Sequence, residues 1–186
     1  MSEAQRPGFR RLGGQRVWQG VVVAVDVDRF AAPDGSEFER EVVRHPGAVS
    51  VVALMDGHPR RVVLVRQYRA ALDRELLEIP AGKRDVAGEP PEVTAARELE
   101  EEVGMRAGRL EELGRFHNSA GFCDEHSIVY LATGLTACAT TAFGVEEEHM
   151  TVEQVALDDV PALVADGTLT DAKSIIGLLL ARDRLR

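Results

Sequence analysis

The sequence predicts an α+β domain with a mixed, largely antiparallel sheet, one central helix and a helical C-terminal end. Short apolar runs rich in valine alternate with turn signals along most of the 186 residues, a pattern typical of strands in hairpins. Pro90 and Pro91 suit a helix start, and the rest of residues 91–103 contains no helix breaker, which predicts a helix in the middle of the chain. Two further helical patterns follow the last predicted strand.

The N-terminal part is predicted to be a loose segment followed by a β-hairpin. Residues 1–14 are polar and contain glycine, whereas the β-branched stretch 17–30 predicts a strand. The turn signal "APDGSE" then leads to residues 38–45, the predicted returning strand. We therefore divide the chain into residues 1–45, a flexible segment with a hairpin, and residues 46–186, the main domain.

The main domain is predicted to contain a sheet and three helices. Its strands are predicted at "AVSVVALM", "RVVLVRQY", "LLEIPAG", "RLEELGRFHN", "HSIVYLAT" and "MTVEQVAL". The helices are predicted at 91–103, "LDDVPALVADG" and "DAKSIIGLLLARDR", with Asp171 as the N-cap of the last one. The stretch "TACATTAFGVEEEH" is predicted to be a loop.

Composition and charge exclude several functional classes. The formal net charge of −9 argues against general nucleic-acid binding, which needs a basic surface. Two cysteines without a C-x-x-C pair exclude a cysteine-rich zinc site. The N-terminus lacks the apolar core of a secretory signal, and the longest apolar runs are far shorter than the roughly 20 residues of a membrane span. We therefore expect a cytoplasmic protein with neither nucleic acid nor membrane as its partner.

The central helix carries four glutamates in five consecutive positions, in "RELEEEVG". An α-helix turns by about 100° per residue, so Glu98, Glu101 and Glu102 share one face. The apolar residues expected to pack on the sheet lie roughly opposite, and they are Val93, Ala96, Leu99 and Val103.

Glu100 lies about 150° from the centre of the acidic face and is not expected to join it. Arg97 precedes Glu101 by four positions and can hold its orientation. Converging carboxylates suit a hard cation such as Mg²⁺ or Mn²⁺. The alternative is a solvated acidic face, since runs of charge usually face solvent.

The stretch "GKRDVAGEPPEVTAARELEEEVGM" resembles the Nudix box, G-x5-E-x7-R-E-U-x-E-E-x-G-U, in which U is a bulky aliphatic residue. Glu89 and all the following constrained positions fall in register, whereas six residues instead of five separate Gly82 from Glu89. The resemblance implies the Nudix fold, an α/β/α sandwich around a mixed sheet, here with an N-terminal β-hairpin extension. It also implies hydrolysis of a nucleoside diphosphate linked to another moiety.

The resemblance further implies a metal site of one to three Mg²⁺ or Mn²⁺ ions. Its ligands are Glu98, Glu101 and Glu102 with the carbonyl of Ala81, and Arg97 belongs to the same catalytic group. In the acidic run "VEEEHM", Glu146 is the first choice and Glu148 the second for the base that takes the proton from the attacking water.

Further stretches, among them "VRQYR", "LEIPAG" and "DAKS", look like the ADP-ribose pyrophosphatase branch of this family. That resemblance implies a nucleotide-sugar substrate and a homodimer with a shared active site, in which residues 17–45 cross to the partner. Arg44 and Arg69 are implied to contact phosphate or ribose, and either Trp18 or Phe38 is implied to stack on adenine.

The loop "SAGFCDE" corresponds to a stretch where the branch usually shows S-P-G. Here Ala120 replaces the proline, and the resemblance implies that Gly121 and Glu125 line the ligand. The leading interpretation is an Mg²⁺-dependent enzyme that converts ADP-ribose, or a related ADP-sugar, to AMP and ribose 5-phosphate. The alternatives are a hydrolase of another nucleotide sugar such as GDP-mannose, a non-catalytic ligand-sensing Nudix domain, and a structural protein with an acidic helix.

Overall fold

The computed structural model describes residues 8–139 and 149–186, which form two compact units. The first unit comprises the described residues up to Pro46 together with His117–Glu125, and the second comprises the remaining described residues. The sequence did not predict that 117–125 groups with the N-terminal strands. The division into functional parts at residue 45 stays a prediction.

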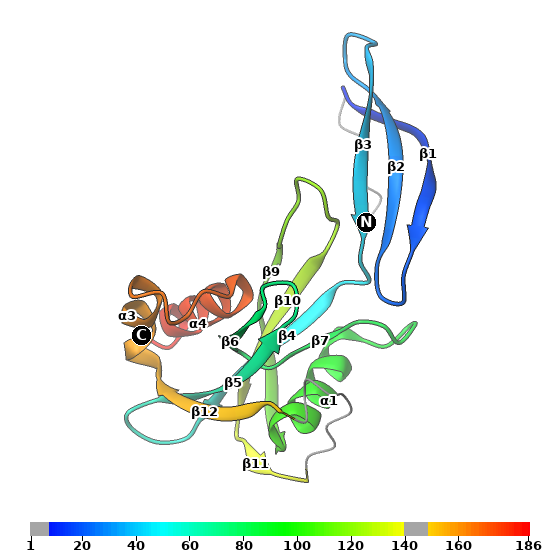
Figure 1. Cartoon of the computed structure of the whole chain (residues 1–186). Coiled ribbons are helices and arrows are strands. Elements are labelled where there is room, and N and C mark those ends of the chain that lie inside the picture. Colours follow the sequence, from blue (N-terminus) through cyan, green and yellow to red (C-terminus); the bar gives the residue numbers. More distant parts are fainter. Residues whose placement is uncertain (1–7, 140–148) are drawn as a thin grey trace. The chain divides into compact units, whose positions relative to one another are not determined.

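The first unit contains a three-stranded antiparallel sheet in the order β1-β2-β3 (Figure 1). Its strands are β1 (Arg10–Gln19), β2 (Ala24–Ala31) and β3 (Glu37–Arg44). The predicted hairpin is present as β2 and β3. The predicted single strand over 17–30 is wrong, because the chain turns where the Gly20 amide donates to the Val23 carbonyl at 2.9 Å, and glycine inside a strand pattern marks such a break.

The prediction that residues up to 14 are loose is also wrong from Arg10 onward. A hairpin of β2 and β3 leaves one edge of β2 with unpaired backbone groups. β1 pairs with that edge, from Arg10 opposite Ala31 to Gln19 opposite Ala24. The polar composition of this segment is therefore compatible with a strand, because its side chains are mostly exposed.

The second unit is built on a seven-stranded mixed sheet in which β12, β5, β4, β10 and β9 are neighbours in that order, while β6 pairs with β5 and β7 with β4. β10 is parallel to β4, whereas β5 and β7 are antiparallel to it. The strands are β4 (Ala48–Met55), β5 (Arg61–Arg69), β6 (Arg74–Glu78), β7 (Ala81–Lys83), β9 (Arg109–His117), β10 (His126–Thr133) and β12 (Thr151–Ala156). Two short strands, β8 (Met105–Arg106) and β11 (Thr136–Ala137), pair with each other.

Helices are present at all three predicted places, although the one predicted over "LDDVPALVADG" is divided into a 3-10 helix and a shorter α-helix. α1 spans Pro91–Val103, and Gly104 ends it in the left-handed conformation with φ 63°. A short 3-10 helix, η1 (Leu157–Asp159), leads into α3 (Val160–Ala165), and α4 spans Ala172–Arg184. Asp171 caps α4 as predicted, because its carboxylate accepts from the Ser174 amide at 3.0 Å. No helix in the described part of the chain is long and apolar enough to cross a membrane.

Helices cover both faces of the sheet, with α1 on one face and α3 and α4 on the other (Figure 1). Along β4, Val49, Val51 and Ala53 belong to the core beneath α1, whereas Val52 and Leu54 belong to the core beneath α4. Strands buried on both faces read as continuous apolar runs, which explains "AVSVVALM". The α/β/α sandwich predicted from the resemblance is thus confirmed.

Candidate active site

The acidic face of α1 lies against β7, the short strand that opens the box loop. A Cβ atom built on Gly82 would lie 1.8 Å from the Glu98 carboxyl carbon, so a larger residue here would displace the Glu98 side chain from its position. The backbone amide of Ala81 donates to Glu102 Oε2 at 3.0 Å. Of the three predicted ligands, Glu102 therefore contacts Ala81, whose carbonyl was predicted to join them, and Glu98 lies against the next residue, Gly82.

Arg97 connects the remaining carboxylates. Its Nη1 lies 2.9 Å from a carboxylate oxygen of Glu98 and 2.9 Å from one of Glu101, and its Nη2 lies 3.5 Å from Glu89. The Thr94 hydroxyl also donates to Glu89 at 2.7 Å, and this hydrogen bond, followed by those from Arg97, lowers the pKa of the Glu89 carboxyl. The predicted orienting contact from Arg97 to Glu101 is present.

The packed face of α1 differs from the predicted one. Val93 is 48% exposed, while Thr94 and Ala95 are buried together with Leu99 and Val103. The apolar pattern placed Val93 inward, but Ala95, Leu99 and Val103 are the α1 residues that pack with the sheet, while the Thr94 hydroxyl binds Glu89.

The acidic face consequently borders the packed face instead of lying opposite it. The side chains of Glu98 and Glu101 are only 13% and 25% exposed. A solvated acidic face does not account for carboxylates this buried, which favours the ligand interpretation. Glu100 points away from them, as expected, and forms two hydrogen bonds of 2.9 Å with Arg106.

The donor set fits a hard divalent cation chemically, since it consists of carboxylate and carbonyl oxygens. Within residues 8–139 and 149–186, however, no group of three acidic, histidine or cysteine side chains is arranged to hold a metal ion. Glu98 and Glu101 contact Arg97 and Glu102 accepts from Ala81. Metal ligation by these residues therefore stays a prediction, and binding would require the carboxylates to exchange part of these contacts.

Behind this corner lies a buried ion cluster of Arg69, Glu78, Lys173 and Asp171. Arg69 donates to both carboxylate oxygens of Glu78, from Nε at 2.7 Å and from Nη2 at 2.5 Å. Lys173 Nζ donates to the same carboxylate and lies 3.0 Å from Asp171. Burial by itself would raise the pKa of Glu78, but the hydrogen bond from Arg69 and the charges of Lys173 and Arg69 outweigh it and hold that pKa low.

The sequence reasoning missed Glu78 and Lys173. The signal was present in the sequence, because "VRQYR" contains Arg69, "LEIPAG" contains Glu78, and "DAKS" contains both Asp171 and Lys173. Ser174 adds a further link, since its hydroxyl accepts from the Ile79 amide at 2.8 Å. The sequence does not show that the side chains of Glu78 and Lys173, which are 95 positions apart, contact each other.

Arg44 and Glu125, the charged substrate residues predicted in the first unit, both have partners within that unit. Arg44 binds Asp26 at 3.0 Å, Asp124 at 3.0 Å, and also Asp28, so it is not merely an exposed strand charge. Glu125 lies 3.8 Å from His45.

The aromatic candidates differ in their surroundings. Phe38 stacks on Phe30 with 5.5 Å between ring centroids, and Arg40 lies over its ring. Trp18 is 53% exposed. Gly121 lines a cavity of about 350 Å³ together with Phe30 and Arg40. Glu146 and Glu148 lie outside the described residues.

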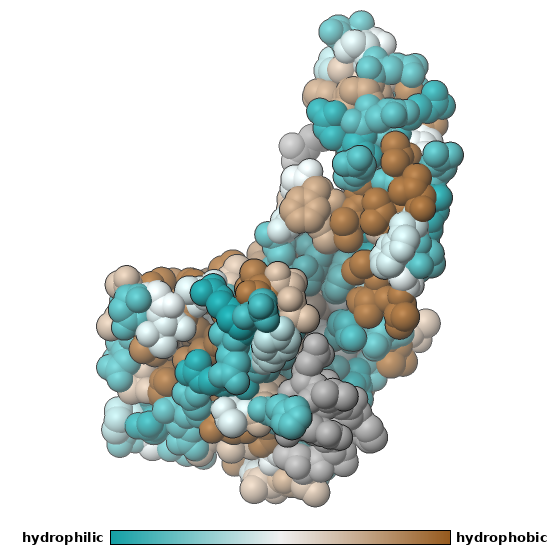
Figure 2. Space-filling model, viewed as in Figure 1, coloured by the Kyte–Doolittle hydropathy of each residue, from teal (hydrophilic) through white to brown (hydrophobic). Residues whose placement is uncertain are grey.

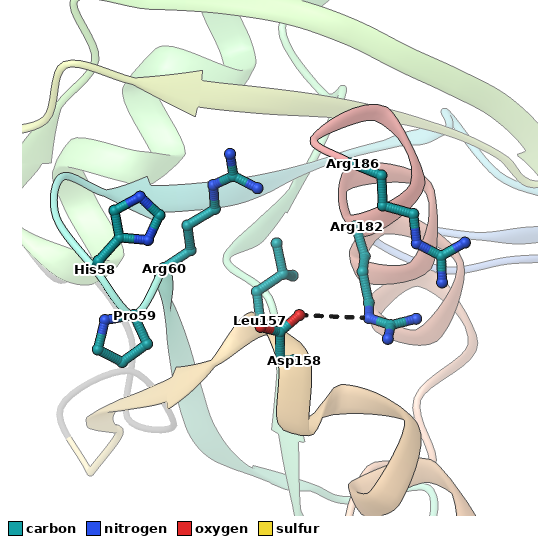
Figure 3. Close-up of a pocket in the computed structure, with 7 residues that line it drawn as sticks. All are labelled: His58, Pro59, Arg60, Leu157, Asp158, Arg182 and Arg186. Carbon is teal, nitrogen blue, oxygen red and sulfur yellow. Dashed lines mark ion pairs between the residues drawn. The ribbon is translucent and has the colours of Figure 1, made fainter.

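A separate cavity of about 220 Å³ lies in the second unit between the β4–β5 turn and the end of α4 (Figure 3). Three arginines line it. Arg182 points to Asp158 at 3.8 Å, and Arg60 donates to the Leu185 carbonyl at 2.5 Å. Cations are favourable at a helix C-terminus, and Arg60 binds a backbone carbonyl at that end of α4. None of the predicted site residues lines this cavity.

The chain is similar to several known proteins. A family model described as the NUDIX domain matches residues 44–176. The chain is 38% identical to an ADP-ribose pyrophosphatase of Bacillus subtilis over 165 residues, 89% of this chain and 88% of that protein. It is also 38% identical to a methanol dehydrogenase activator of Bacillus methanolicus over 164 residues, 88% and 87% of the two chains.

A solved structure shares the fold. The crystal structure of an ADP compounds hydrolase matches with a TM-score of 0.82 and 22% identity, covering 96% of this chain and 94% of that one. At this level of identity the likeness supports the fold alone.

Proposed function

The chain belongs to the Nudix family, and from this premise we propose that it is an Mg²⁺-dependent hydrolase that cleaves the pyrophosphate bond of ADP-ribose or a related ADP-sugar. The products would be AMP and ribose 5-phosphate. The observation that carries the proposal is the placement of Glu98 and Glu102 on the Gly82 and Ala81 backbone, bordered by Arg97. Identity to an ADP-ribose pyrophosphatase over most of both chains supports the substrate class.

The acidic corner has the groups that the reaction needs for its metal. Glu98, Glu101, Glu102 and the Ala81 carbonyl would hold Mg²⁺ or Mn²⁺, one to three ions per site. A bound cation would neutralise charge on the pyrophosphate and lower the pKa of a coordinated water. Arg97 would keep two of the carboxylates oriented, as it does in this structure.

The remaining residues are proposed to bind the substrate or transfer a proton. Arg69 and Arg44 would contact phosphate or ribose, which suits guanidinium groups. Trp18 or Phe38 would stack on adenine, and Gly121 and Glu125 would line the ligand.

Glu146 is proposed as the general base, with Glu148 as the second choice. Replacing the true base by glutamine should lower kcat by about 10²–10⁴-fold with little change in KM. If neither Glu146→Gln nor Glu148→Gln slows turnover tenfold, the base lies elsewhere.

We also propose a homodimer in which residues 17–45 reach the partner and complete a shared active site. The first unit, part of whose surface is apolar in Figure 2, exposes several large apolar side chains. They are Phe9, Val17, Trp18, Val21, Val22 and Phe122. Exposed apolar patches of this kind mark interaction surfaces. Light scattering at the assay concentration tests the dimer, and a fully active monomer would reject it.

A substrate panel tests the proposed activity. ADP-ribose, ADP-glucose, GDP-mannose, NADH and diadenosine polyphosphates are incubated with Mg²⁺, and phosphate is measured after coupling to a phosphatase. We expect the highest kcat/KM for ADP-ribose. A preference for GDP-mannose would favour the second candidate, which relatives named GDP-mannose pyrophosphatases support. Absence of hydrolysis with every compound would indicate a ligand-sensing domain.

A further inference from the structure

The ion cluster of Arg69, Glu78, Lys173 and Asp171 has a buried end and an open end. The side chain of Glu78 is 1% exposed and that of Lys173 is 12% exposed. The side chain of Arg69 is 40% exposed. Arg69 is therefore the member through which the cluster meets solvent.

Stability by itself is a weak explanation for this cluster. Its two cations and two carboxylates balance in charge, but removing charges from water costs free energy that their attraction often only offsets. Leu77 and Ile79, the neighbours of Glu78 along the chain, are fully buried in the core beneath α4. Apolar side chains would suit such surroundings at least as well as a charged network does.

The contacts leave Arg69 held in one orientation. Its Nε and Nη2 both bind Glu78, and a two-point contact of this kind fixes the plane of a guanidinium group. Lys173 in turn binds the same carboxylate and Asp171, which restrains Glu78. The Nη1 edge of Arg69 lies on the side away from these contacts.

Arg69 also lies within electrostatic reach of the acidic corner. The hydrogen bond to Glu78 is the largest cause of the raised pKa of Arg69, and the charge of Glu102 contributes to the same shift. The backbone connects the two places directly, since Ala81, whose amide binds Glu102, follows Glu78 by three positions. Arg69 and the carboxylates proposed to bind the metal are thus linked through the same short segment, since Arg69 binds Glu78 at one end of it and Glu102 accepts from Ala81 at the other.

We propose that Glu78 and Lys173 are positioning residues that hold the Arg69 guanidinium so that its outer edge binds the pyrophosphate of the substrate. The inference rests on the proposed function for the identity of the substrate. It adds two residues to the site, neither of which needs to contact the substrate.

A double-mutant cycle between Lys173 and Arg69 tests this inference. Arg69→Met should lower kcat/KM for ADP-ribose by about a hundredfold, the effect of losing a hydrogen bond to a charged group. Lys173→Met preserves the length of the side chain and should lower kcat/KM by about tenfold, mainly through KM, as loss of an orienting partner does. In the double variant, Lys173→Met should add almost nothing to the loss caused by Arg69→Met.

Arg66→Met is the matched control. Arg66 lies on the same strand, three residues before Arg69, and forms an ion pair with Glu153 at 2.5 Å. Because this pair does not contact the cluster, its loss should change kcat/KM less than twofold. The melting temperature of each variant is measured alongside, so that a purely structural role appears as lowered stability with an unchanged KM.

The outcomes separate this inference from the proposed function. If the double variant loses no more kcat/KM than Arg69→Met alone, the positioning role is supported. If the two single losses in kcat/KM multiply in the double variant, or if KM is unchanged in Lys173→Met, the positioning role is overturned. The cycle is repeated on the Kd of inorganic pyrophosphate with Mg²⁺, which needs no turnover. A wild type that cleaves no nucleotide sugar rejects the proposed function, and the pyrophosphate cycle then decides the positioning role by the same two results.

Discussion

The two units of this chain are stabilised by different interactions, although both are built on β-sheets. The second unit contains two clusters of buried aliphatic side chains, one on each face of its sheet. In the described part of the first unit, the buried apolar residues are only Ala24 and Ala31, while the carboxylate of Asp28 is 1% exposed. Ion pairs in the first unit occupy positions that apolar side chains occupy in the second.

This difference predicts different sensitivities. Asp26 and Asp28 are bound by Arg11, Arg16 and Arg44 across the strands of the first unit. Such pairs depend on pH and are partly screened by salt, whereas apolar burial is not. A small sheet without its own apolar core is marginal by itself, which fits the proposal that a partner covers its exposed residues.

The largest expected effect is confined to the second unit and concerns chemistry instead of stability. Glu102→Gln should lower kcat/KM for ADP-ribose by more than about a hundredfold, since ligand and orienting groups of a metal site contribute at least this much. Calorimetry should show an unchanged fold, because Glu102 lies at the margin of the core and its replacement relieves repulsion. Wild-type turnover at ordinary millimolar Mg²⁺ would contradict the assignment.

The next largest effect is expected from a substitution that removes ion pairs of the first unit. Arg44→Met leaves Asp26 and Asp28 without one shared cation and should destabilise this sheet by about 2 kcal/mol. Hydrogen exchange should accelerate for amides of β2 and stay unchanged for those of β4.

Arg29→Met serves as the control for that variant. The pair between Arg29 and Glu37 has a separation of 4.0 Å, and both side chains are more than half exposed. Loss of this pair should change the free energy of opening that hydrogen exchange reports for β2 by less than about 0.5 kcal/mol. Equal effects of Arg44→Met and Arg29→Met on hydrogen exchange would show that the ion pairs of Asp26 and Asp28 do not stabilise the sheet more than an exposed pair does.

Acid should distinguish the two units. The hydrogen bond from Arg16, followed by that from Arg44, lowers the pKa of Asp26 from 3.8 to about 2. Because the folded value is the lower one, this carboxylate contributes stability that is present above pH 4 and is lost as the pH falls from 3.8 to about 2. Amides of β2 should lose protection in that window before those of β4. An NMR titration midpoint for Asp26 near 3.8 would contradict the ion-pair account.

The smallest effect tests the helix register within the acidic stretch. Glu100→Ala removes a carboxylate that pairs with the exposed Arg106, and surface pairs contribute little. We expect kcat/KM within twofold of wild type. A loss comparable to that of Glu102→Gln would show that the two positions are not on different sides of α1.

The local features could be predicted because neighbours along the chain determine them. The bounds of α1, its end at Gly104 and the cap at Asp171 follow from helix geometry and backbone preferences. The separation of Glu100 from its three neighbours follows from the same periodicity.

The errors arose where contacts from distant segments compete with local preference. The β-branched run after Trp18 predicted one strand, but Gly20 allows a turn, and β2 offers an open edge to β1. The apolar pattern of α1 placed Val93 on the sheet, but Val93 is exposed and the packing is made through Ala95, Leu99 and Val103. Pairing and close packing are decided between segments, so neither is visible within one of them.

The sequence by itself determined the acidic face of α1, its spacing and its family, since carboxylates three and four positions apart must share a side of any α-helix. Only the tertiary structure decided that Glu98 lies on Gly82, that these carboxylates are half-buried, and that Arg69, Glu78 and Lys173 form one cluster. The physical reason is distance along the chain. A helix repeats within a few residues, whereas the carboxylate of Glu78 and the ammonium of Lys173 meet only after the sheet and α4 have packed.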